Sequence, residues 1–150
     1  MRGKQRPIVL DTNVYVQALR DAAASQALAE FHAAYAPWEW LSGVVAQELR
    51  IGVGARGAER LEANIFRPFE DRGRLVTPSY RCWKQAGAVL RAYAERWGPA
   101  IRRLPRSLVN DVLLALSCRE IGAVLITHDL TDFERIARIA RFEFAAPRSG

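Results

Sequence analysis

Short runs of apolar residues alternate along the chain with longer stretches in which apolar residues recur at helical spacing. The short runs predict buried strands, and the spaced stretches predict helices that cover them. We expect strands at residues 8–10, 38–41, 74–77 and 124–126, and an edge strand at 142–144. Strands that alternate with helices in this way are typical of an α/β fold with a central parallel sheet and helices on both faces.

Serine and glycine residues mark where several helices should begin and end. A serine hydroxyl can accept a hydrogen bond from a free backbone N–H in the first turn, and a glycine can take up the backbone conformation that ends a helix. The expected N-caps are Ser42, Ser79 and Ser107, and the expected ends are Gly52 with Gly54, Gly98 and Gly122.

Three further helical segments follow from spacing alone. Apolar positions at helical spacing begin near Val14 and continue toward Phe31, and another helix is expected from about 58 to 69. The last helix is expected over 132–138, with Asp132 as its N-cap.

Four acidic residues lie where strands should end or helices should begin: Asp11, Glu48, Asp111 and Asp129. If the strands are parallel, Asp11 and Asp129 emerge at the same edge of the sheet, which is where α/β folds hold ligands. Helical spacing turns Glu48 toward the apolar side of its helix. Carboxylates gathered in this way would repel one another unless a divalent cation neutralised them.

Each acid also has a purely structural interpretation. Asp11 could cap the helix that follows it, and Asp111 could be stabilised by the positive end of its own helix. Glu48 could form an ion pair with Arg50 or with another arginine across the fold. Asp129 and Asp132 could exchange roles between site and cap, and both alternatives stay open.

Other chemistries have little support in the sequence. Residues 52–57 match G-x-G-x-x-G, but they follow an expected helix, whereas a dinucleotide site needs a preceding strand. Cys82 and Cys118 have no metal-ligand spacing and are expected to be buried thiols. His32 and His128 are too few for a histidine-based zinc site. Since no Ser-His-Asp or Cys-His nucleophile is apparent, hydrolysis by a metal-activated water is the simplest chemistry.

The length and composition indicate one domain, spanning residues 1–150, that binds a polyanion. The formal net charge is +6, and all of the 22 basic residues except Lys4 and Lys84 are arginines, whose planar donors match phosphate. A basic surface around an acidic pocket suits an enzyme that acts on nucleic acid, although a biased genome composition would also enrich arginine. No apolar run suggests a signal peptide or a membrane span, so we expect a cytoplasmic protein.

The sequence resembles the PIN-domain ribonucleases, in particular the VapC-type toxins of bacterial toxin–antitoxin pairs, over nearly its whole length. The segments that carry the resemblance are 9–13 (VLDTN), 42–52 with Gln47-Glu48-Leu49-Arg50 inside, 110–115 (NDVLLA) and 122–133 (GAVLITHDLTDF). The resemblance implies that the four acids are catalytic and that Asp11, Asp111 and Asp129 bind metal. It also implies a pocket that Thr12, Asn13 and Thr127 line, and Asp132 is placed in that pocket as well.

The same resemblance implies an endoribonuclease that uses Mg²⁺ or Mn²⁺, forms a homodimer and is inhibited by a small antitoxin encoded beside it. A processing nuclease without an antitoxin and a non-catalytic RNA-binding module are the alternatives. We expect Arg102, Arg103 and Arg106, just before the helix of Asp111, to contact RNA. The four tryptophans, Trp38, Trp40, Trp83 and Trp97, predict an apolar surface for a protein partner, with at least two of them in the core.

Overall fold

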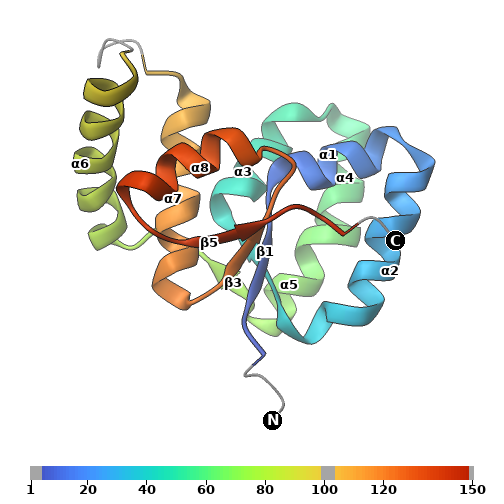
Figure 1. Cartoon of the computed structure of the whole chain (residues 1–150). Coiled ribbons are helices and arrows are strands. Elements are labelled where there is room, and N and C mark those ends of the chain that lie inside the picture. Colours follow the sequence, from blue (N-terminus) through green and yellow to red (C-terminus); the bar gives the residue numbers. More distant parts are fainter. Residues whose placement is uncertain (1–4, 99–103, 149–150) are drawn as a thin grey trace.

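Five short parallel strands form one central sheet in the order β3-β2-β1-β4-β5. The structure is a computed structural model that describes residues 5–98 and 104–148 (Figure 1). The strands are β1 (Ile8–Leu10), β2 (Glu39–Ser42), β3 (Leu75–Val76), β4 (Val124–Ile126) and β5 (Glu143–Ala145). The predicted α/β fold with a parallel sheet is therefore confirmed. Each end of each strand lies within one residue of its predicted position.

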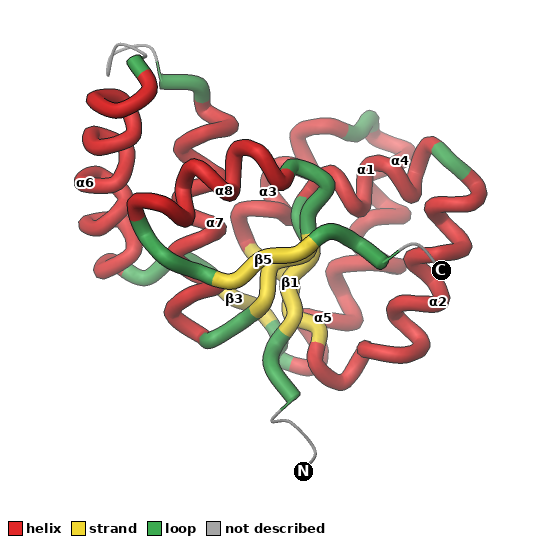
Figure 2. Tube along the Cα trace, viewed as in Figure 1, coloured by secondary structure: helices red, strands yellow, loops and turns green. Residues whose placement is uncertain are grey.

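Helices cover both faces of the sheet (Figure 2). On one side lie α6 (Tyr80–Trp97), α7 (Arg106–Ile121) and α8 (Leu130–Ile139), and on the other lie α1 (Thr12–Arg20), α2 (Ala22–Tyr35), α4 (Ala55–Leu61) and α5 (Arg67–Arg72) (Figure 1). Helix α3 (Gly43–Gly52) contacts both α1 and α7. A 3₁₀ turn, η1 (Ala36–Trp38), precedes β2, and a π-helical turn, η2 (Glu62–Phe66), joins α4 to α5.

The order of the strands places a binding edge between β1 and β4. The chain moves outward from β1 to β2 and β3, and then returns to the other side of β1 to form β4 and β5. Val9 pairs with Leu125 and Leu10 with Ile126, so the residues that follow the two strands lie level with each other. Neighbouring parallel strands whose connections diverge open a crevice at their carboxyl ends. Asp11 and Thr127 both lie at that crevice.

Helix α7 is the buried centre of the helical layer beside β4. Its residues 112–118 are all buried, and the helix packs against α3, α6 and α8. A helix that is apolar on nearly every side is stable only when other elements surround it. This burial fixes the start of α7 firmly, and with it the position of Asp111.

Three of the predicted caps can be compared with the structure directly. The Ser42 hydroxyl accepts a hydrogen bond from Val44 N, and the Ser79 hydroxyl accepts one from Cys82 N, as predicted. The prediction that Ser107 caps α7 is wrong, because the helix begins at Arg106 and Pro105 holds the cap position without a side-chain bond. Proline has the fixed φ that suits the start of a helix, so it sets this boundary before Ser107.

The prediction that Asp132 caps the last helix is also wrong. Helix α8 begins at Leu130, and its N-cap is Asp129, whose carboxylate accepts a 3.3 Å hydrogen bond from Asp132 N. Asp129 stands three residues before Asp132, which is the spacing at which an N-cap side chain reaches the N3 backbone. The cap role thus belongs to Asp129, and the side chain of Asp132 extends from the first turn.

Two helical segments are divided in ways the spacing did not predict. Asp21 separates α1 from α2 and caps the second helix by accepting from Ala24 N. The segment predicted as one helix over 58–69 runs instead from α4 through η2 to α5, where Gly73 ends it at a φ of 65°. No helix within residues 5–98 and 104–148 combines the length and apolar character that crossing a bilayer requires.

Candidate active site

Asp11 is buried at the end of β1 and held from both sides. Its Oδ2 accepts a 2.8 Å hydrogen bond from the Thr127 hydroxyl, and its Oδ1 accepts one of the same length from Thr12 N. The second bond makes Asp11 the N-cap of α1, so the structural role that the sequence left open is real. The first bond joins it to the end of β4, so Asp11 is also part of the crevice between the strands.

Thr127 connects further polar groups across the same crevice. Its hydroxyl accepts hydrogen bonds from Asn13 Nδ2 at 3.2 Å and from Asp129 N at 2.9 Å. Asn13 in turn accepts from His128 N at 3.2 Å. The two strand-end segments, 11–13 and 127–129, therefore form one hydrogen-bonded unit. Asn13 and Thr127, both predicted to line this pocket, lie within hydrogen-bond distance of each other.

Glu48 reaches the crevice from α3. The Thr12 hydroxyl donates a 3.1 Å hydrogen bond to Glu48 Oε1, and the glutamate is half-buried. The alternative of an ion pair with Arg50 does not hold, because Arg50 binds Glu62 and also lies 3.7 Å from Glu70. Glu48 is thus tied to the segment that follows β1 rather than to a cation.

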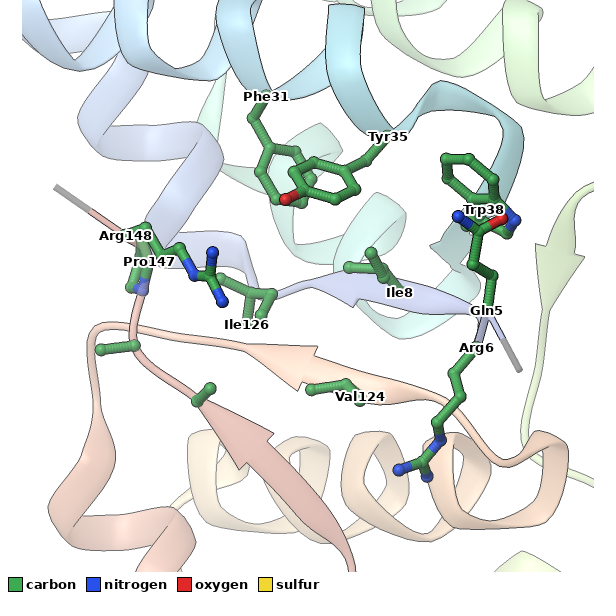
Figure 3. A pocket seen from close by; sticks show the side chains of 12 residues that line it. Gln5, Arg6, Ile8, Phe31, Tyr35, Trp38, Val124, Ile126, Pro147 and Arg148 are labelled. Atoms are coloured by element: carbon green, nitrogen blue, oxygen red, sulfur yellow. The ribbon is translucent and has the colours of Figure 1, made fainter. Parts of the chain in front are cut away.

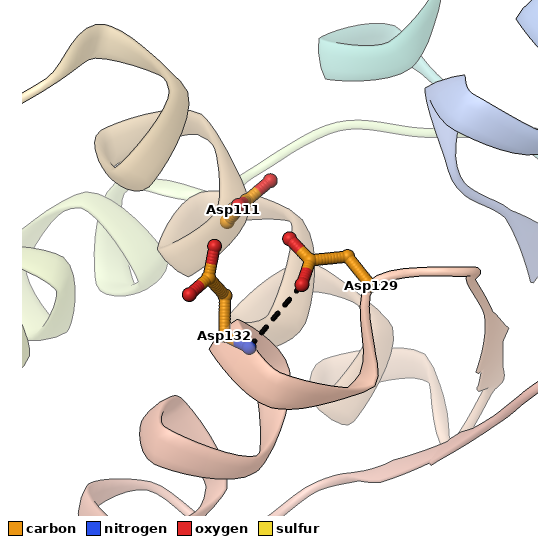
Figure 4. A group of neighbouring side chains, drawn as sticks. All are labelled: Asp111, Asp129 and Asp132. Carbon is orange, nitrogen blue, oxygen red and sulfur yellow. Dashed lines mark hydrogen bonds between the residues drawn. The ribbon is translucent and has the colours of Figure 1, made fainter.

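Three aspartates converge beside this unit (Figure 4). Asp111 projects from α7, while Asp129 and Asp132 come from the cap and first turn of α8. Each offers one carboxylate oxygen such that all three oxygens lie within 4.8 Å of one another. Asp111 and Asp129 were predicted to lie together here. Asp132, which was predicted both as a helix cap and as a pocket residue, lies with them, and its carboxylate takes no part in capping α8.

Burial, together with the neighbouring carboxylates, raises the pKa values of four of these acids. Burial, reinforced by the charges of Asp11, Glu48, Asp129 and Asp132, raises the pKa of Asp111 from 3.8 to about 8. Burial also raises the pKa of Asp11, against the opposing hydrogen bonds from Thr127 and Thr12. Burial likewise raises the pKa values of Glu48 and Asp132. Burial is thus the main cause of the raised pKa values, and the neighbouring negative charges add to it.

No basic side chain within residues 5–98 and 104–148 forms an ion pair with any of these five acids. Arg135 is close enough to oppose the raised pKa of Asp132, but it lies beyond 4 Å. A set of carboxylate oxygens without a cation matches the donors that Mg²⁺ and Mn²⁺ prefer. The residues present therefore fit a divalent metal ion.

A family model of the PIN domain matches residues 8–139. The chain belongs to the PIN domain family. No curated protein sequence matches it.

Solved structures share this PIN domain fold. FitAcB from Neisseria gonorrhoeae is 22% identical, with a TM-score of 0.67 over 93% of this chain and 97% of that chain. DNA-bound VapBC from Salmonella typhimurium is 19% identical, with a TM-score of 0.68 over 96% and 100% of the two chains. VapBC-1 from nontypeable Haemophilus influenzae is 22% identical, with a TM-score of 0.61 over 93% and 96%. At these identities the likeness concerns the fold.

The predicted RNA-contacting arginines are only partly within the described residues of this PIN domain. Arg102 and Arg103 lie outside them. Arg106 is the first residue of α7 and is exposed, one and a half turns before Asp111. Contact of these arginines with RNA stays a prediction.

A hollow that the sequence did not predict lies beside the acidic cluster. It has a volume of about 260 Å³ and lies between the end of α6 and the beginnings of α7 and α8. Its walls include Tyr93, Trp97, Asp111, Asp132 and Arg135, and we call it the aromatic hollow. Tyr93 and Trp97 stand four residues apart on α6, which puts them on one face, but nothing in the sequence shows that this face turns toward Asp111.

A larger hollow of the PIN domain lies elsewhere, on the sheet face below α2 (Figure 3). Its volume is about 440 Å³, and apolar side chains such as Ile8, Phe31, Tyr35 and Val124 line it. It contains no carboxylate, so it is not a place for metal-assisted chemistry. Trp38 borders it, whereas Trp40 and Trp97 are partly buried and pack against the core.

Proposed function

We propose that the protein is a metal-dependent endoribonuclease that hydrolyses phosphodiester bonds. The observation that carries the proposal is the convergence of Asp111, Asp129 and Asp132 next to Asp11 and Glu48, without an ion-pair partner in the described part of the chain. Such a cluster is costly unless a cation joins it. Its place at the carboxyl edge of the parallel sheet leaves it open to a substrate.

Each residue of the site has a proposed role. Asp111, Asp129 and Asp132 would hold Mg²⁺ or Mn²⁺, and Asp11 would add a ligand, since each of its oxygens accepts one hydrogen bond and keeps a second lone pair. The bound ion supplies Lewis-acid polarisation of the phosphate and activation of water. Thr12, Asn13 and Thr127 hold Asp11 and Asp129 in place through the hydrogen bonds described above.

Glu48 is the proposed proton acceptor. Thr12 fixes one of its oxygens, Oε1, and leaves Oε2 for a proton from the attacking water. Burial raises the pKa of Glu48, which makes it a better base than an ordinary glutamate. The exposed Arg106 would contact the RNA backbone, and the same role is proposed for Arg102 and Arg103.

We further propose that the protein is the toxin of a toxin–antitoxin pair and forms a homodimer. The sequence resembles VapC-type toxins, and the similar structures include DNA-bound VapBC complexes. An antitoxin that placed an arginine among the aspartates would inhibit by taking the place of the metal ion. Co-expression with the adjacent open reading frame should yield a stable complex and relieve growth arrest. A protein that arrests growth regardless of that frame, or never does, would not be such a toxin.

A cleavage assay tests the enzymatic proposal. Purified protein is incubated with single-stranded RNA and, separately, with single-stranded DNA in Mg²⁺, Mn²⁺ or chelator. We expect RNA cleavage only with metal, none from Asp111→Asn, and full cleavage by the control Asp71→Asn, an exposed aspartate on α5. Cleavage in chelator would contradict the metal requirement, and cleavage of DNA alone would contradict the substrate. RNA binding without cleavage would favour the non-catalytic module.

A further inference from the structure

The aromatic hollow combines three kinds of group that a nucleotide can use. Tyr93 and Trp97 form an aromatic wall, with ring centroids 4.7 Å apart. Arg135 brings a cation, with its guanidinium carbon 5.6 Å from the centroid of the Trp97 ring. Asp111 and Asp132 form the side of the hollow that is shared with the acidic cluster.

The three helices that build the hollow fix these groups relative to one another. Helix α6 packs against α7 and α8 (Figure 1), so its last turns face the first turns of the other two. Tyr93 is almost fully buried and supports the ring of Trp97, which is only partly buried. A partly exposed aromatic side chain can serve as a platform on which a base of a single strand stacks.

We propose that the aromatic hollow is a subsite for one base of single-stranded RNA, next to the phosphate held at the acidic cluster. The inference rests on the proposed function and specifies where the substrate's neighbouring nucleotide binds. The base stacks on Trp97, and Arg135 moves from the ring toward the adjoining phosphate, since a guanidinium binds either a π face or a phosphate oxygen. Stacking tolerates any base, so the subsite contributes affinity and register rather than a fixed sequence.

The alternative is that Trp97 is only a core residue, with Arg96 and Arg135 packed around it as cation–π partners. This alternative predicts an effect of Trp97 on stability that is independent of RNA. The subsite predicts an effect on binding that depends on the presence of a base. The two are separated by comparing a normal RNA with one that lacks its bases.

The experiment measures, in Mg²⁺, binding of a short labelled oligouridine whose phosphorothioate linkages resist hydrolysis, and of an abasic ribose-phosphate chain of equal length and linkage. The variants are Trp97→Leu and Trp97→Phe, with Trp83→Leu as the matched control, because Trp83 lies on the same helix and is 56% exposed away from the hollow. We expect Trp97→Leu to weaken oligouridine binding about 5- to 100-fold, and Trp97→Phe to weaken it less. Neither substitution should alter binding of the abasic chain.

Arg135 gives a second, independent measurement. Arg135→Gln should lower the slope of log affinity against log salt by about 0.7, the value of one phosphate contact on a single strand. Arg138→Gln on the same helix, whose side chain instead lies 3.7 Å from Glu134, should leave the slope unchanged.

The outcomes separate this inference from the proposed function. If the wild type cleaves RNA but Trp97→Leu binds oligouridine as Trp83→Leu does, the subsite is refuted and the nuclease stands. Equal losses on the normal and abasic chains would likewise refute it, since the base would play no part. If the wild type neither binds nor cleaves RNA, both proposals fail. Should Trp97→Leu not fold, a Trp97→Phe variant with unchanged oligouridine binding and an unchanged salt slope for Arg135→Gln would overturn the inference.

Discussion

The hydroxyl of Thr127 donates a 2.8 Å hydrogen bond to Oδ2 of Asp11, across the ends of the two central strands. Both residues are buried, and the same hydroxyl accepts from Asn13 and from the backbone of Asp129. One side chain therefore fixes groups from both sides of the crevice. The position of the candidate catalytic carboxylates depends on this contact as much as on the strands themselves.

Replacing Thr127 with valine should weaken both the fold and the site. The change keeps the shape of the side chain but leaves Asp11, Asn13 and Asp129 N without their partner in a buried place. We expect the free energy of unfolding to fall by about 1–3 kcal/mol, together with slower RNA cleavage. Urea denaturation and a cleavage assay measure the two effects. The control is Thr131→Val on the exposed surface of α8, which should change stability by no more than about 0.5 kcal/mol. Equal behaviour of the two variants would mean that the Thr127 contact is unimportant.

The stability of the metal-free protein should depend on pH through Asp111. Its pKa is about 8 in the folded protein against 3.8 as its ordinary value, so the folded state holds this proton more tightly than the unfolded state does. The contribution of Asp111 to stability is therefore complete below about pH 4, declines as pH rises and is lost above about pH 8. The decline is at most about 1.4 kcal/mol per pH unit.

Melting temperatures in chelator between pH 5 and pH 9 measure this dependence, with pH values chosen to span the titration. Asp111→Asn removes the titrating group, so the variant should become progressively more stable than the wild type as pH rises. The exposed Asp71→Asn serves as the control and should track the wild type. Parallel curves for wild type and Asp111→Asn would show that the carboxyl group is not held in a repulsive environment.

Asp129 and Asp132 should differ in their effect on stability, although both should bind the metal ion. Asp129 caps α8, so Asp129→Ala should lower the stability of the metal-free protein by about 1 kcal/mol, whereas Asp132→Ala should not. Asp129→Asn keeps a capping oxygen and should retain that stability. Both Asp129→Asn and Asp132→Asn should bind Mn²⁺ more weakly in calorimetry. The assignment of the cap would be wrong if Asp132→Ala destabilised the metal-free protein as much as Asp129→Ala.

Much of this architecture is local and could be predicted from the sequence. The apolar runs at 8–10 and 124–126 are strands whose central residues, Val9 and Leu125, are fully buried, and a polar residue directly after such a strand must lie at the edge of the sheet. Asp11 and the 127–129 segment follow from that rule. Ser42 and Ser79 could be predicted as caps because each stands directly before its helix and offers a hydroxyl acceptor to the first turn.

The failures arose where two neighbouring residues could serve the same local purpose. Pro105 and Ser107 can both start α7, and the fixed φ of the proline decides between them. Asp129 and Asp132 can both cap α8, and the earlier one does. The aromatic hollow depends on how α6 rotates against α7 and α8, which is a tertiary property that no spacing within α6 expresses. The same holds for the bond between Thr12 and Glu48, which are far apart in sequence.

The central claim is that five clustered carboxylates are held in mutual repulsion until a divalent cation joins them. Its most direct test is a titration of Mn²⁺ against the melting temperature of the wild type and of Asp111→Asn at neutral pH. In chelator the variant should melt at the same temperature as the wild type or higher, because the wild type must hold a proton on the buried Asp111 at a pH well above the ordinary pKa of an aspartate. With saturating Mn²⁺ the wild type should gain several degrees and the variant much less, since binding only to the folded state stabilises it. Equal gains in the two proteins, or no gain in either, would contradict the claim.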